Sequence, residues 1–512
     1  MITRFSAAAL AFVIATACSF GAPNLLIITV DDMNCDSVGV YGCPLTDITP
    51  NMDKLASEGI RFEMAHVQVG NCYPSRNVMF SGRFPHSSGV EGFYQVRDIK
   101  FPVMCDVMQK AGYYVGIRGK VSHSTPYQPY RWDNDLTKTP EGRQENIKDV
   151  PSYYRSTKRG IENAEKAGKP FVINVNISDP HKPFWKPSDQ QTADKKASKV
   201  YSSEEVPVPG FLWDDDVVRQ ELALYYNSVR RADDAVGAVL KALDESGKSD
   251  ETVVMFISDH GMPLPFAKTQ LYHHSTRTPW MVRWPGVVKP GSVDGDHMIS
   301  AVDMLPTLCE IVGTEIPQGV EGRSFLPLIK GEKQDNRGFV IKEYNENAGG
   351  NRHPIRGVQT AEYLYLFNPW SDGTRRFKTA TQGTATYRQM VKLAKTDSKI
   401  AARLDLFDHR VVEELYDVMT DPDCLNNLVK SPEHADDLAA LHRILGEWMK
   451  ETNDPLLEAF NHRDNSEKLD ELMTTIEDVA KKKRSERRRI KKDGNPKGKG
   501  KSNAKKNKKK SQ

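Results

Sequence analysis

Four short apolar runs in the first half of the chain predict buried strands. They lie at residues 24–30, 113–117, 171–177 and 252–257. Runs of this length without polar alternation are typical of strands covered on both faces, as in parallel sheets. Amphipathic helical patterns fall between the runs, at residues 50–59, 101–111 and 221–243. This alternation predicts an α/β fold whose large, mainly parallel sheet is flanked by helices.

The pattern changes after about residue 335. Three shorter strand-like pieces, at 338–342, 363–367 and 414–418, precede one helical pattern at 434–450. Strands grouped ahead of a helix are typical of an α+β arrangement. We therefore expect a main domain over residues 23–335 and a smaller C-terminal α+β subdomain over residues 336–478.

The first residues have the features of a signal peptide. Arg4 supplies a positive charge, an apolar run follows at 7–17, and Ala15-Thr16-Ala17 offers a cleavage site. The run is too short to span a bilayer, so cleavage would leave no transmembrane segment here. We expect residues 1–22 to direct export to the periplasm or the extracellular space. A buried first strand and a lipid-anchored Cys18 are the alternatives.

Charge is unevenly distributed along the chain. Of the 71 basic and 68 acidic residues, positions 481–512 hold 17 and 2. Residues 1–480 therefore hold 54 basic and 66 acidic residues, a net charge of −12. The low apolar content after residue 478 predicts a disordered basic tail over residues 479–512. Such a tail could contact polyanions, although a purely solubilising role fits its composition equally well.

Acidic residues follow three of the predicted strands. Asp31 and Asp32 come after the first run, Asp259 and His260 after the fourth, and Asp179 after the third. The carboxyl ends of parallel strands lie at one edge of a sheet, where ligands bind. An Asp-Asp pair alone is more typical of a turn or helix cap than of a metal site. Its recurrence with Asp259 favours a divalent cation, Ca²⁺ or else Mg²⁺, with His260 adding a nitrogen.

Cys72 stands out among the seven cysteines. The cysteines are too few and too scattered for a disulfide framework, and no CxxC or Cys/His cluster indicates zinc. Cys72 opens a predicted helix in the stretch Cys72-Tyr73-Pro74-Ser75-Arg76. Arg76, one helical turn further on, gives the thiol the cationic setting that a reactive cysteine needs.

This stretch, with Gly82-Arg83 downstream, resembles the first signature of the formylglycine-dependent sulfatases of the alkaline phosphatase superfamily. Gly112-Tyr113 through Gly119-Lys120 to His123 is similar to the second signature. Other segments that resemble the family are Asp179-Pro180-His181, Ser258-Asp259-His260-Gly261, Glu414-Leu415-Tyr416-Asp417 and Asp421-Pro422. The resemblance extends from about residue 24 to residue 455 and implies that residues 23–335 form the catalytic domain.

The resemblance implies a modified nucleophile and a bound cation. A separate maturase that reads Cys-x-Pro-x-Arg would oxidise Cys72 to formylglycine, whose hydrate attacks the sulfur of the substrate. Such covalent catalysis divides one displacement into two easier steps. The implied metal ligands are Asp31, Asp32, residue 72 (Cys72), Asp259 and His260.

The same resemblance assigns roles to five further side chains. Arg76 would steady the formylglycine, and Lys120 and Lys268 would bind the sulfate oxygens. His123 would act on the proton of the nucleophile, and His181 would protonate the leaving oxygen or nitrogen. Taken singly, Lys120, His123 and Lys268 are more typical of solvated surface residues, and only the family resemblance assigns them to the site. His273 and His274 are either pocket residues or ordinary loop histidines.

The chain departs from the common family pattern at three places. Tyr73 and Asn71 are bulkier or more polar than the usual residues beside the cysteine. Two residues separate Lys120 from His123, where many sulfatases have one. His260 replaces the more usual Asn. The last two features are shared with iduronate-2-sulfatase-like members.

Several stretches resemble the heparan N-sulfatase (sulfamidase) branch more closely. They are Met262-Pro263-Leu264-Pro265, Lys268-Thr269, Leu271-Tyr272, Pro354-Ile355-Arg356, Trp448 and Glu451-Thr452-Asn453-Asp454-Pro455. This resemblance implies a sulfated glycan as substrate, with N-sulfoglucosamine favoured. An O-sulfatase of the iduronate or algal-polysaccharide type stays open, because pocket loops determine the substrate. A phosphatase or phosphonate hydrolase of the same superfamily and a non-catalytic polyanion-binding protein are the remaining alternatives.

Overall fold

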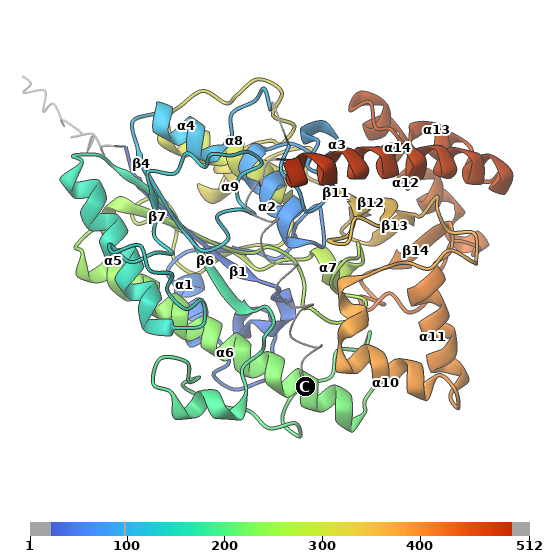
Figure 1. Ribbon diagram of the computed structural model, residues 1–512, viewed down its shortest axis with the longest axis horizontal. Helices are drawn as coiled ribbons and strands as arrows, with labels where there is room; N and C mark the ends of the chain where they lie inside the picture. Colours follow the sequence, from blue (N-terminus) through green and yellow to red (C-terminus); the bar gives the residue numbers. More distant parts are fainter. Residues whose placement is uncertain (1–21, 97–98, 494–512) are drawn as a thin grey trace, which may run out of the picture.

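A central eight-stranded sheet forms the body of the protein (Figure 1). The computed structural model describes residues 22–96 and 99–493, with side chains up to Glu486. The predicted signal peptide therefore lies, except for Ala22, outside the described residues. The strands in spatial order are β5 (Asn134–Asp135), β4 (Tyr114–Arg118), β6 (Phe171–Pro180), β1 (Asn24–Asp31), β7 (Thr252–Ser258), β8 (Trp280–Arg283), β2 (Ile60–Phe62) and β9 (Ser292–Asp294).

The first five of these strands are parallel, and β8 runs antiparallel to β7. β1 lies between β6 and β7, with Val30 opposite Ile177 and Ser258. This register brings the carboxyl ends of β1, β6 and β7 to one edge of the sheet. The predicted α/β fold with a large, mainly parallel sheet is confirmed.

Helices cover both faces of the sheet, which explains the continuous apolar runs. Leu26, Ile28 and Val30 of β1 pack into one hydrophobic core, and Leu25 and Ile27 pack into a second. The first core includes α1 (Pro50–Ser57), α5 (Val150–Lys166) and α6 (Asp216–Glu245). The second includes α2 (Cys72–Ser81), α4 (Met104–Lys110), α8 (Met304–Val312) and α9 (Leu326–Ile329).

A four-stranded antiparallel sheet forms the smaller C-terminal subdomain. Its strands are β11 (Phe339–Glu346), β12 (Arg352–Thr360), β13 (Tyr363–Phe367) and β14 (Glu413–Asp417). It carries α10 (Ala385–Leu393), α11 (Ser398–His409), α12 (Ala435–Glu451), α13 (Leu457–Asn461) and α14 (Ser466–Asp493). The shorter elements of the protein are β3 (Ala65–His66), β10 (Ile299–Ser300), α3 (Pro85–Ser88) and α7 (His273–Thr276). The predicted α+β subdomain is confirmed, but it holds more helices than the one expected.

The basic segment near the C-terminus differs from its prediction. α14 extends from Ser466 to Asp493, so the predicted disorder is wrong for residues 479–493. Lys, Arg and Glu are good helix formers, and a helix already anchored by its first turns extends at little cost. Residues 494–512 lie outside the described residues.

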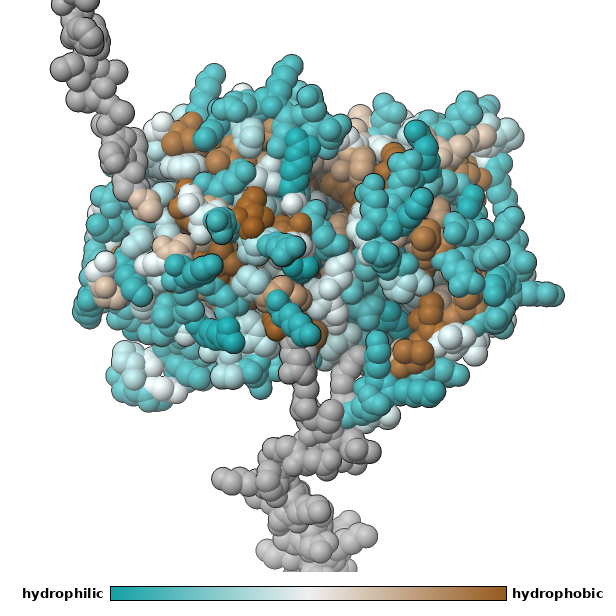
Figure 2. All heavy atoms as spheres, turned by 90° about the horizontal axis from the view of Figure 1, so that it is seen from above, coloured by the Kyte–Doolittle hydropathy of each residue, from teal (hydrophilic) through white to brown (hydrophobic). Residues whose placement is uncertain are grey.

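The surface is mainly hydrophilic, with separate hydrophobic patches on the face seen in Figure 2. Within residues 22–96 and 99–493, no helix combines the length and the apolar character needed to cross a membrane.

Candidate active site

Cys72 is the first residue of α2 and lies at the carboxyl edge of the central sheet. Its predecessor Asn71 is extended (φ −141°), and Pro74 in the first turn has the fixed φ that favours a helix start. The N-terminus of a helix carries a partial positive charge that favours anions. The whole of α2 is buried, and Cys72 is only 3% exposed.

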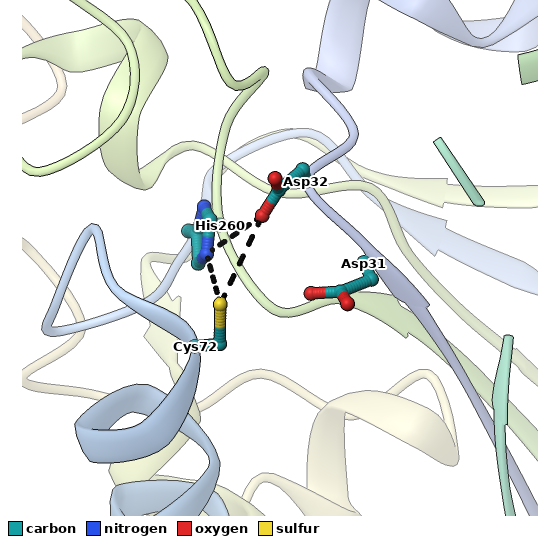
Figure 3. Close-up of side chains that lie close together, drawn as sticks. All are labelled: Asp31, Asp32, Cys72 and His260. Carbon is teal, nitrogen blue, oxygen red and sulfur yellow. Dashed lines mark hydrogen bonds and ion pairs between the residues drawn. The ribbon is translucent and has the colours of Figure 1, made fainter. Parts of the chain in front are cut away.

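Asp31, Asp32 and His260 surround the sulfur of Cys72 (Figure 3). Sγ lies 4.0 Å from Oδ1 of Asp32 and 3.5 Å from Nε2 of His260. That nitrogen is also 3.1 Å from Oδ1 of Asp32. One possible ligand atom from each of the four residues lies within 4.8 Å of the others.

This donor set fits a small divalent cation. The fully buried carboxylate of Asp31 forms ion pairs with Lys120 and Arg76 but has no other hydrogen-bond donor among the described residues. Nδ1 of His260 donates to the carbonyl of Gly261 (3.0 Å), which turns its Nε2 toward Asp32 and Cys72. Such a second bond commonly orients a metal-binding histidine. Carboxylate oxygens are the preferred ligands of Ca²⁺ and Mg²⁺.

Asp259, the fifth predicted ligand, lies beside this group and is held by Arg76. The guanidinium contacts Oδ2 of Asp259 through two nitrogens, each at 3.0 Å. Arg76 also donates to Thr29 (2.7 Å) and to Asn176 (2.5 Å) and lies 3.6 Å from Asp31. Oδ1 of Asp259 accepts a hydrogen bond from the backbone nitrogen of Asp32 (3.0 Å). Asp259 therefore holds Arg76 and the backbone of Asp32 in position, and both of its carboxylate oxygens already have a protein partner.

Two lysines add positive charge to the site. Nζ of Lys120 lies 2.5 Å from Asp31, and Nζ of Lys268 lies 2.6 Å from Asp32 and 3.7 Å from Sγ of Cys72. Burial opposes ionisation of the Cys72 thiol, but Lys268 and Lys120 outweigh it and hold the thiol pKa well below its usual range. An anion at this position is therefore stabilised by buried cations.

His123 and His181 complete the predicted catalytic set. His123 is among the groups that lower the pKa of Cys72, and its ring packs on Tyr73 (5.2 Å) and Phe93 (5.9 Å). Burial raises the pKa of Asp31, but Lys120 and His181 are the largest of the charges that outweigh it and hold that pKa well below its usual range. The structure thus gathers all the predicted residues: Asp31, Asp32, Cys72, Arg76, Lys120, His123, His181, Asp259, His260 and Lys268.

Two residues that the sequence did not indicate hold the turn that carries His181. Nζ of Lys148 donates to Asp179 (2.6 Å) and to the carbonyls of His181 (2.6 Å) and Ser178 (3.1 Å). Arg231 donates to both oxygens of Asp179 (2.7 and 3.1 Å). Lys148 lies in a loop and belongs to no motif, so the sequence gives no sign of its role. Arg231 lies on the apolar face of the helical pattern at 221–243, and a charged residue at such a position indicates a buried ion pair.

His273 and His274 have their contacts at the junction with the C-terminal subdomain. Nδ1 of His273 accepts a hydrogen bond from Gln359 of β12 (2.9 Å). Nε2 of His274 lies 3.1 Å from Asp423. Both therefore have structural partners at that junction.

Comparison with known protein families gives two matches. A model described as Sulfatase matches residues 23–314. A model described as N-sulphoglucosamine sulphohydrolase, C-terminal, matches residues 259–372.

Curated relatives cover most of the chain. An ulvan-active sulfatase of Formosa agariphila is 26% identical over 438 residues, which cover 85% of this chain and 82% of that protein. The N-sulphoglucosamine sulphohydrolase of Homo sapiens is 26% identical over 467 residues, covering 84% of this chain and 91% of that protein.

Solved structures share the fold. BT4656, solved in complex with its substrate D-glucosamine-2-N,6-O-disulfate, has a TM-score of 0.64 at 19% identity. The match covers 85% of this chain and 98% of that chain. The phosphonate monoester hydrolase of Agrobacterium radiobacter has a TM-score of 0.62 at 15% identity, covering 84% and 96%.

The site predicts that Ca²⁺ stabilises the protein. At free Ca²⁺ about 100-fold above the dissociation constant, a single site raises the free energy of unfolding by about 2.7 kcal/mol. We expect the midpoint of thermal unfolding, measured by calorimetry, to rise on adding Ca²⁺ to chelated protein. Asp31→Asn should abolish that rise. Glu343→Gln, at a buried carboxylate already paired with His86 and Arg356, should retain it. An equal rise in both variants would place the cation elsewhere.

Proposed function

The chain belongs to the sulfatase family of sulfuric ester and sulfamate hydrolases, and we propose that it removes sulfate from a sulfated glycan. The proposed nucleophile is a formylglycine made from Cys72. The favoured substrate is N-sulfoglucosamine, because the C-terminal family match and the human relative are both described as N-sulphoglucosamine sulphohydrolase.

The observation that carries this proposal is the convergence of three buried cations around Cys72. Arg76 is fully buried, and the side chains of Lys120 and Lys268 are 17% and 8% exposed. Each reaches a carboxylate of the cluster, and Lys268 also reaches the sulfur of Cys72. Buried positive groups of this kind offset the charge of sulfate oxygens far better than exposed ones.

The modified residue and the cation have complementary tasks in this proposal. Formylglycine would supply the hydroxyl of a hydrated aldehyde as nucleophile, and a bound Ca²⁺ would supply positive charge that favours the ionised form of that hydroxyl. Asp31, Asp32, residue 72, Asp259 and His260 would hold the cation. Arg76, fixed by Thr29, Asn176 and Asp259, keeps α2 in position so that residue 72 stays at the sheet edge.

Two histidines would move protons on opposite sides of the reaction. Nδ1 of His181 donates to the carbonyl of Lys182 (2.6 Å), so Nε2 is the atom that can give a proton to the leaving group. Lys148 and Arg231 hold this turn through Asp179. His123, whose Nδ1 is buried, lies beside residue 72 and would act on the proton of the nucleophile.

The proposal has two cellular requirements. A maturase must read Cys72-Tyr73-Pro74-Ser75-Arg76 and oxidise the cysteine. Export to the periplasm or the extracellular space rests on the sequence of residues 1–22.

An O-sulfatase is the second candidate for the substrate. The ulvan-active sulfatases match this chain at 25–27% identity, much like the human N-sulphoglucosamine sulphohydrolase. BT4656 was solved with a sugar that carries both an N-sulfate and an O-sulfate. The family assignment and the full set of site residues favour either sulfatase over a phosphatase, a phosphonate hydrolase or a non-catalytic polyanion-binding protein.

The modification is tested by mass spectrometry of protein coexpressed with a maturase. We expect the peptide that contains residue 72 to have the mass of formylglycine in active protein. Cys72→Ala should lose sulfatase activity, because no nucleophile can form. Cys43→Ala, at a half-buried cysteine outside the site, should keep both activity and modification. A plain thiol at position 72 in fully active protein would refute the mechanism.

Sulfate release from three monosaccharides tests the substrate. We expect N-sulfoglucosamine to be hydrolysed about tenfold or more faster, in kcat/KM, than glucosamine 6-O-sulfate or iduronate 2-O-sulfate, because a pocket that pairs its polar groups with one substrate discriminates against others. Release from an O-sulfate alone would replace the N-sulfatase assignment with the O-sulfatase one.

The role of His181 predicts a dependence on the leaving group. His181→Ala should slow release from N-sulfoglucosamine by about 10²–10⁴-fold, because the amine leaves only with a proton. An aryl sulfate should be affected much less, since its phenolate leaves unprotonated. The control is His274→Ala, at the subdomain junction, which should not change the ratio of the two rates. Equal losses on both substrates would show that His181 is not the acid.

A further inference from the structure

Helix α14 has two halves of different character. Leu469 and Met473 of the first half are buried in the hydrophobic core, and Arg375 forms an ion pair with Asp470 (2.6 Å). The second half, residues 481–493, holds nine basic and two acidic residues. None of its side chains described up to Glu486 belongs to a hydrophobic core, and Lys481, Lys482 and Lys483 are exposed. This basic half is therefore not explained by apolar packing.

The basic half lies against loops of the main domain and of the small sheet. Nε of Arg484 is so close to Gly350, in the β11–β12 turn, that a β-carbon there would lie 2.9 Å from it. Burial raises the pKa of Glu91, but Arg352 and, less strongly, Lys483 are among the charges that outweigh it and lower that pKa. Figure 1 shows α14 along the upper edge, with its C-terminal end toward α2. The basic half of α14 thus lies beside Gly350, and its charge acts on Glu91.

The loop that carries Glu91 leads directly to the active site. Two residues beyond Glu91, the ring of Phe93 lies 6.0 Å from Tyr73 and 5.9 Å from His123. Tyr73 follows Cys72 in α2, and His123 acts on the Cys72 thiol. The segment whose Glu91 senses the charge of Lys483 therefore also holds an aromatic ring that packs beside the catalytic cluster.

The basic half of α14, called the basic strip below, differs in charge from the rest of the chain that precedes it. Residues 1–480 carry a net charge of −12, which repels a polyanion, whereas residues 481–493 carry +7 over about 20 Å of helix. A polymer with sulfate groups repeated along its length can occupy both the pocket and the basic half of α14, which raises its effective concentration at the site.

We infer that Lys481, Lys482, Lys483 and Arg484 of α14 bind the anionic chain of a sulfated polysaccharide substrate outside the catalytic pocket. The inference rests on the proposed glycan sulfatase activity and names a polymer as the substrate class. The basic strip attracts and binds the polymer, whereas the residues around Cys72 bind the sulfate group that is removed.

The test compares the full chain with a variant in which Lys481, Lys482, Lys483 and Arg484 are each replaced by Gln, which keeps helix propensity. The measurement is the ratio of kcat/KM for heparin to kcat/KM for a small aryl sulfate. We expect this ratio to fall about tenfold or more, and its decline with rising salt to become shallower. In the control variant, Lys392, Lys395 and Lys399 are each replaced by Gln. These exposed lysines lie on or beside α10 and α11, and the control variant should have the same ratio as the wild type.

The outcomes separate this inference from the proposed function. An unchanged ratio, or the same change in the control variant, overturns the inference while sulfatase activity stands. Absence of sulfate release from every substrate by formylglycine-bearing wild type overturns the proposed function. In that case, binding of heparin and of single-stranded DNA to the full Cys72→Ala chain is measured by calorimetry. Heparin binding unaffected by the α14 substitutions, or binding of DNA alone, overturns the inference.

Discussion

The buried guanidinium of Arg76 joins α2 to the ends of three neighbouring strands. Its partners are Thr29 and Asp31 of β1, Asn176 of β6 and Asp259 after β7. A buried charge is tolerated only where paired groups replace its lost hydration. The strands must therefore carry these polar residues at the sheet edge, and α2 can pack there in only one orientation. That orientation directs Cys72 into the carboxylate cluster, so the position of Cys72 depends on Arg76.

The site also contains backbone that ordinary residues avoid. Asp32 (φ 69°) and Lys120 (φ 49°) are left-handed, as is Thr269 (φ 64°), which follows Lys268. Such conformations cost about 1–3 kcal/mol each and persist only where surrounding contacts hold them. Here the contacts are the lysine–carboxylate pairs and the hydrogen bond from Asp32 to Asp259. Asp32 and Lys120, which the family resemblance assigned to the active site, therefore combine a strained backbone with a buried ion pair.

The central strands and the motif residues were predictable from sequence, whereas their supports were not. A strand buried on both faces has no polar alternation, so β1 and β7 were evident as apolar runs. Lys148 reaches the His181 turn only through the folded chain, and a loop lysine has no local signal for that role. Disorder was predicted for residues 479–493 because few apolar residues there can be buried. The segment is helical instead, since α14 continues from earlier turns that Leu469 and Met473 anchor in the core.

The parallel order of the sheet has a consequence for the timing of folding. Asp32 and Asp259 form their hydrogen bond across 227 residues of sequence, and β1 pairs with β6 and β7 rather than with nearby segments. Contacts between distant parts of a chain form late and slowly. The edge that buries Cys72 cannot be assembled before β7 has been synthesised. Until then that edge cannot enclose residues 72–76, so they are more accessible to another enzyme than in the folded protein, where Cys72 is 3% exposed.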